Sequence, residues 1–173
     1  MAAPTAVDER AQLLRMIADQ RTAVRNALSG LTEEQARSTP SASGLSLAVI
    51  AKHLAQGEYS GVAVRIGGRP EQGSPEQTWH SGFVLGPDET VADVLANWGE
   101  VAAVTEEVVR AEPSLDRVVE VPPEVRPWLQ VEVITVRWLL LHLIEESARH
   151  AGHADVIRES IDGRGAWELA GRG

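Results

Sequence analysis

The chain has 173 residues, a formal net charge of −9 and no cysteine. A chain of this length can bury a core of its own, so we expect residues 1–173 to form a single domain. The net negative charge argues against a nucleic-acid partner. The absence of cysteine excludes disulfides, thiolate metal ligands and a cysteine nucleophile.

Apolar periodicity predicts a first helix over residues 7–28. A short capped turn of helix should follow at 31–35, because Thr32 and Gln35 have the spacing of a capping box. Ser46 can cap a second long helix over 47–66, which contains His53, Gly57 and Gly61. The two glycines predict that another backbone or a ligand comes close to this helix.

A long crossover is predicted at 67–88, where Gly and Pro are frequent and Trp79 and His80 are expected as packing or rim residues. Thr90 should begin the third long helix, and Pro113 should close it. The link 114–130 contains three prolines and is expected to be irregular, with room for a short strand. The fourth helix is predicted from about Glu132 to Ser160, followed by a tail with Trp167 that folds back or frays.

Four helices joined partly by long connections indicate an all-α fold, a four-helix bundle with long crossover connections. Metal and cofactor sites in such bundles are built from side chains that point inward from adjacent helices. No run approaches the roughly 20 apolar residues needed to cross a bilayer, and the first residues lack the pattern of a signal peptide. We therefore expect a cytoplasmic protein without a membrane partner.

The fourth helix carries His142, Glu146, His150 and His153 at spacings of four, four and three residues. An α-helix advances about 100° per residue, so these side chains share a stripe roughly 80° wide. Apolar neighbours indicate that the stripe faces a packed flank, where polar groups need partners. A metal ion would satisfy several of them at once.

Glu146 and His150 lie one turn apart and can bind one ion, and His53 is the only other histidine at a partly apolar helical position. Two histidines and one carboxylate leave coordination positions open, as in a catalytic zinc site, although nickel and non-haem iron accept the same donors. The alternative is an ordinary polar helix face, since Glu145 and Arg149 form an i, i+4 ion pair that needs no special role. His142 and His153 could be ligands, residues that support the ligands, or substrate contacts.

Two segments resemble the DinB-like superfamily of metal-binding four-helix bundles, especially its actinobacterial mini-circle branch. They are GLTEEQARSTPSASGLSLAVIAKHLAQGE and RWLLLHLIEESARHAGHADVIRE. The resemblance implies a divalent ion held by His53, Glu146 and His150. Many relatives have histidine at the position of Glu146, and the glutamate variant is similar to the metal-binding domain of mycothiol-dependent maleylpyruvate isomerase.

The resemblance also implies a function, because relatives include transferases and isomerases in which a metal activates the thiol of mycothiol or bacillithiol. A Lewis acid lowers the pKa of a bound thiol, so an external low-molecular-weight thiol would be the nucleophile. We therefore expect a metal-dependent mycothiol S-transferase that acts on small electrophiles, with His142 and His153 tuning the site. The alternatives are a non-catalytic metal-binding stress-response or sensor bundle, and a metal-dependent hydrolase. A homodimer through helix faces is compatible with each of these functions.

Overall fold

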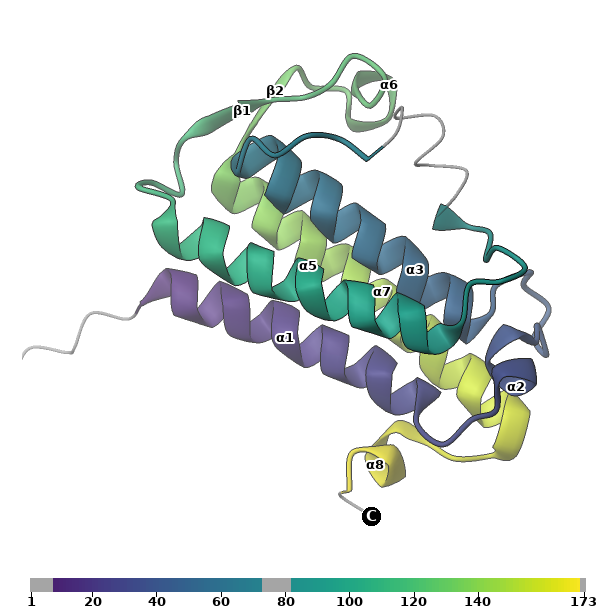
Figure 1. Ribbon diagram of the computed structural model, residues 1–173. Helices are drawn as coiled ribbons and strands as arrows, with labels where there is room; N and C mark the ends of the chain where they lie inside the picture. Colours follow the sequence, from purple (N-terminus) through teal and green to yellow (C-terminus); the bar gives the residue numbers. More distant parts are fainter. Residues whose placement is uncertain (1–7, 73–81, 172–173) are drawn as a thin grey trace, which may run out of the picture.

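The computed structural model describes residues 8–72 and 82–171 of the chain. Four long helical elements lie side by side as a bundle (Figure 1). They are α1 (Glu9–Leu28), α3 (Leu47–Glu58) with its continuation η1 (Tyr59–Ile66), α5 (Val91–Ala111) and α7 (Val136–Asp162). The closest pairings are α1 with α7 and α3 with α5. The predicted all-α four-helix bundle is confirmed.

Short elements close the two ends of the bundle. The strands β1 (Val118–Glu120) and β2 (Val133–Thr135) lie at one end with α6 (Arg126–Leu129), and α2 (Glu33–Arg37) and α8 (Ala166–Leu169) lie at the other (Figure 1). Of the two alternatives for the tail, it folds back, because α8 contacts α1. Trp79 and His80 lie outside the described residues. None of the described helices is long and apolar enough to span a membrane.

Side-chain caps fix where the helices begin. The hydroxyl of Ser46 accepts a hydrogen bond from the backbone N–H of Val49 at the start of α3. The capping box predicted at Thr32 and Gln35 is present in α2, and Thr90 caps α5 in the same way. Each such cap is worth about 1 kcal/mol relative to alanine. These local signals explain why the bounds of α2, α3 and α5 could be read from the sequence.

The second predicted helix changes type halfway along its length. It is α-helical to Glu58 and then continues as the π-helix η1. π-Helical turns are rare and occur frequently at functional sites. A Cβ atom on Gly61 would lie 3.2 Å from Cδ2 of Leu139, so the glycine lets η1 approach α7 closely.

The predicted start of the fourth helix at Glu132 is wrong, because α7 begins at Val136. Residues 133–135 instead form β2, which pairs antiparallel with β1 and places Val119 opposite Ile134. The β-branched side chains in this segment favour a strand once a partner strand is available. Thr135 then caps α7 by accepting a hydrogen bond from the N–H of Trp138. The helix ends at Gly163, which has φ 78°.

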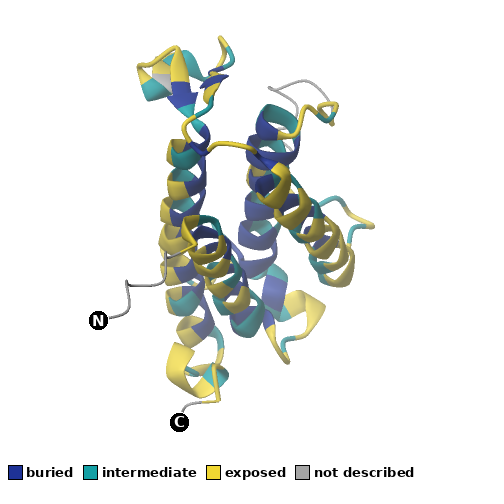
Figure 2. Cartoon of the chain, turned by 90° about the vertical axis from the view of Figure 1, so that its left-hand side faces the viewer, coloured by how far each residue is buried: buried dark blue, intermediate teal, exposed yellow. Residues whose placement is uncertain are grey.

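Buried residues line the inner faces of the helices (dark blue in Figure 2). They form two apolar clusters, one toward the strand-bearing end of the bundle and one around Trp98 toward α2. A polar group is buried with them. Glu58 is 1% exposed, and it accepts hydrogen bonds from Arg21, Trp98 and Thr105 on two other helices. The last residue of α3 is thereby tied to α1 and α5.

Candidate metal centre

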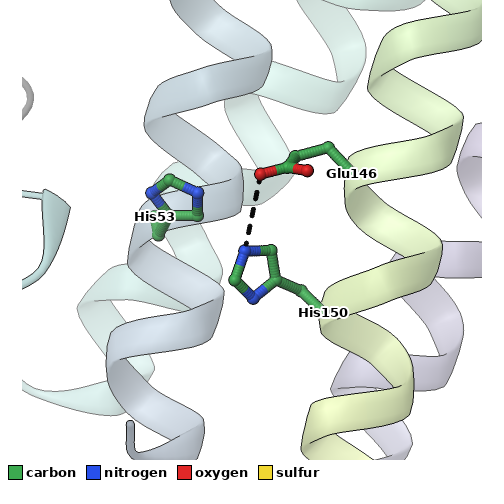
Figure 3. Close-up of side chains that lie close together, drawn as sticks. All are labelled: His53, Glu146 and His150. Carbon is green, nitrogen blue, oxygen red and sulfur yellow. Dashed lines mark ion pairs between the residues drawn. The ribbon is translucent and has the colours of Figure 1, made fainter. Parts of the chain in front are cut away.

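The structure brings together three of the residues that the sequence singled out. His53 lies on α3, and Glu146 and His150 lie one turn apart on α7 (Figure 3). Each offers one ligand atom, and these atoms all lie within 4.8 Å of one another. Nε2 of His150 is 3.7 Å from Oε1 of Glu146. The site thus combines His53 with two residues that lie more than 90 positions further along the chain, as in metal sites built between adjacent helices of a bundle.

The separation of these atoms is close to what a metal ion requires. Bonds of about 2.0 to 2.2 Å in a tetrahedral arrangement separate any two ligand atoms by roughly 3.4 Å. The pair on α7 is near that value, and the triad as a whole would contract by about 1 Å or a little more around an ion. Rotation of the half-buried side chains of His53 and Glu146 can supply such a shift. The donor set therefore fits a divalent cation, while metal binding itself stays a prediction.

The surroundings of the two imidazoles favour their neutral form. Burial lowers the pKa of His53, although the nearby charge of Glu146 opposes the shift. Burial also lowers the pKa of His150 to about 4, and the neighbouring His53 adds to this effect. The ring of His150 is 9% exposed, and its Nδ1 has no hydrogen-bond partner among the described residues. Without such a partner the doubly protonated, charged ring is disfavoured.

Two further residues hold the triad and were not predicted as part of the site. The ring of Phe83 stacks on that of His53, with centroids 4.4 Å apart and an interplanar angle of 28°. Arg149 Nη1 donates to Oε2 of Glu146 at 2.7 Å, which leaves Oε1 facing His150. The sequence showed the i, i+4 pair of Arg149 with Glu145, which is present, but not the additional bond to Glu146. Phe83 follows a long connection, so no local pattern relates it to His53.

The other two histidines of the stripe lie on opposite sides of the triad. His142 stacks on Trp138 with ring centroids 4.9 Å apart, and its Nδ1 is 3.5 Å from a carboxylate oxygen of Glu145. His153 is exposed, and its ring meets that of His150 edge-on at 5.3 Å. Neither belongs to the group of converging ligand atoms. His142 therefore contacts Trp138 and Glu145 on its own helix, and His153 contacts the ring of His150.

A cavity of about 290 Å³ opens beside the triad. His53 and Glu146 form part of its wall, as do His142 and Trp138. Most of the remaining lining is apolar and comes from α3, η1, α7 and the segment before β2. A small molecule bound there would lie next to an ion held by the triad, so the arrangement suits chemistry on a small substrate.

Comparisons with known proteins give a family and a fold for the chain. A family model described as mycothiol-S-transferase matches residues 12–163. No curated protein matches the chain. Among solved structures, the chain is similar to the crystal structure of a conserved protein from Enterococcus faecalis. The two are 13% identical with a TM-score of 0.68, over 92% of this chain and 100% of that one, a likeness that concerns the fold.

Proposed function

Because the chain belongs to the mycothiol-S-transferase family, a branch of the DinB-like superfamily, we propose that it is a divalent-metal-dependent S-transferase that joins the thiol of mycothiol to a small electrophile. The observation that carries the proposal is the convergence of His53, Glu146 and His150 beside a largely apolar cavity, which His53 and Glu146 help to line. Zinc suits two imidazoles and a carboxylate best, and nickel or iron would also accept this set.

In the proposed reaction the thiol gives its proton to solvent water, and the sulfur then forms a bond to an electrophilic carbon. A bound divalent ion would supply Lewis acidity, which lowers the pKa of the thiol so that thiolate is available near neutral pH. The chain has no cysteine, so the sulfur nucleophile must be external. When the electrophile carries a leaving group, that group departs with the electron pair of the broken bond.

The residues of the chain have three tasks in this scheme. The triad would hold the ion while leaving coordination positions open for the thiol. Phe83 and Arg149 restrain His53 and Glu146, and such supporting contacts affect both metal affinity and reactivity. His142 lies in the wall of the cavity, one turn from Glu146, where it would contact the bound substrate. The apolar wall excludes water that would otherwise compete with the thiol.

Two alanine variants test this assignment. His150→Ala should remove both bound metal and turnover, because two remaining ligands hold a divalent ion poorly. His153→Ala should slow turnover while metal stoichiometry stays near that of the wild type, because His153 touches His150 without joining the triad. Rates with mycothiol and a reactive electrophile would be measured beside metal content.

The same measurements can overturn the proposal. Equal loss of metal in both variants would make His153 a ligand. If metal-loaded wild type shows no thiol-dependent rate with several electrophiles, the bundle is a non-catalytic metal-binding module.

A further inference from the structure

The cavity beside the triad is elongated along the groove between two helical elements. On α3 and η1 it is lined by His53, Gly57, Gly61 and Arg65, each four residues from the next. On α7 it is lined by a second row with the same spacing, from Trp138 to Glu146. His53 lies beside Glu146 and Gly61 faces Leu139, so the two rows run in opposite directions. The triad therefore lies at one end of the cavity and Arg65 at the other, roughly 18 Å away along the helix.

Glycine makes room for this cavity. A Cβ atom added to Gly57 would meet no other atom within 4 Å, although the residue lies within α3. Glycine inside a helix costs about 1 kcal/mol relative to alanine, so Gly57 keeps this space open at the expense of helix stability. The cavity floor is thus the bare helix surface between His53 and Arg65.

The walls of the cavity are apolar along most of its length. Side chains from three parts of the fold contribute: Leu54, Leu139, Leu143, Pro122, Val125 and Leu129. Such a lining suits the body of an apolar molecule. It offers few partners to the sugar portion of mycothiol, whose hydroxyl groups would lose hydrogen bonds to water.

Arg65 is the only Lys or Arg among the described residues that line this cavity, and the other polar lining away from the triad end comes from Gln56, Ser60 and Glu71. The side chain of Arg65 is half-buried, and its Nε has no hydrogen-bond partner within the described part of the chain. Burial lowers the pKa of Arg65, and the charge of the exposed Glu71 opposes the shift without a hydrogen bond between them. A buried N–H donor left unpaired is costly. The planar guanidinium fork matches a carboxylate, which can accept two parallel hydrogen bonds from it.

We propose that this cavity binds the electrophile, and that the electrophile is an elongated apolar molecule with a terminal carboxylate held by Arg65. Its reactive carbon would then lie at the triad end of the cavity. The identification of the bound molecule as the electrophile rests on the proposed transferase function, whereas the binding of an apolar carboxylate by Arg65 does not. The two claims can therefore fail separately.

Direct binding tests the proposal without turnover. Octanoate and octanamide share an apolar chain and differ in charge, so they are suitable probes for isothermal titration calorimetry with metal-loaded and chelator-treated protein. Wild type should bind octanoate at least 10-fold more tightly than octanamide in both states. Arg65→Gln should abolish this preference, and Arg65→Lys should retain part of it. Arg69→Gln is the matched control, because Arg69 pairs with Glu107 at the surface and does not line the cavity.

A second pair of variants tests the location. Gly57→Leu should fill the cavity and lower the affinity for both probes at least 10-fold. Gly152→Leu should leave both affinities unchanged, because Gly152 is an exposed helical glycine on α7 with equally open space around it and lies outside the cavity.

Three outcomes would overturn the inference: equal affinity for the two probes, a preference that survives in Arg65→Gln, or a preference that disappears on chelation. The last would place the carboxylate on the metal. A carboxylate preference that depends on Arg65, together with no thiol-dependent turnover, would refute the transferase function and leave the binding site standing.

Discussion

Replacing Glu58 with alanine should destabilise the bundle by about 3 to 5 kcal/mol. The magnitude follows from its surroundings, since Glu58 is 1% exposed and Arg21 is 7% exposed. Each carboxylate oxygen accepts two hydrogen bonds, one from Arg21 and one from either Trp98 or Thr105, at 2.6 to 3.0 Å. Removal of the carboxylate leaves a buried guanidinium without a counter-charge, which is the most costly way to break such a pair.

Urea denaturation and thermal unfolding would measure this loss, and the melting temperature should fall by roughly 6 to 20 °C for a chain of this size. Glu107→Ala is the matched control. It breaks an exposed ion pair with Arg69 and should cost less than about 1 kcal/mol. The double variant Arg21→Met, Glu58→Leu should recover much of the stability, because it removes both charges. A loss below about 1 kcal/mol in Glu58→Ala, or a double variant no more stable than the single one, would refute this reasoning.

Three further predictions concern the candidate metal centre. Chelation should lower the melting temperature, because the native state loses the stabilisation by bound metal, about 2.7 kcal/mol at metal concentrations 100 times Kd. Helical circular dichroism should stay largely intact. Complete loss of helix would mark the ion as structural. In metal-free protein, the free energy of unfolding should fall as the pH drops from 6.5 toward 4. Over this range His150 is protonated in the unfolded chain but stays neutral in the folded protein, where its pKa is about 4. His150→Ala should flatten this dependence, and an unchanged slope would contradict the assigned pKa. Phe83→Ala should weaken metal binding about 10-fold in a competition titration, because the ring of His53 loses its stacking partner, whereas Val84→Ala, at an exposed neighbour, should not.

The parts of the fold that could be predicted depend on local signals. The caps at Thr32, Ser46 and Thr90 act on residues three positions away, so the starts of three helices were readable. The pairing of Glu146 with His150 follows from helical spacing alone. The placement of His53 opposite them came from the partly apolar position of that residue and from the family resemblance.

The remaining features depend on contacts between distant segments. Residues 133–135 form a strand only because β1 is available to pair with them, and the sequence pattern by itself continued the helix. The buried partners of Glu58 lie 37 to 47 residues away, and the only local signal was a glutamate within an apolar helical stretch. Arg65 fits the charged face of a predicted helix equally well, so its position in the cavity required the packing of η1 against α7.

We propose that His53, Glu146 and His150 hold a metal that receives the sulfur of mycothiol. X-ray absorption at the edge of the bound metal, recorded on untagged protein with and without mycothiol, tests it most directly. For zinc we predict nitrogen and oxygen ligands at about 2.0 to 2.2 Å in both samples and a sulfur ligand at about 2.3 Å only with mycothiol. The chain has no cysteine, so a thiolate ligand can come only from the added thiol. No sulfur ligand at saturating mycothiol, or the same metal spectrum after all three residues are replaced by alanine, would contradict the account.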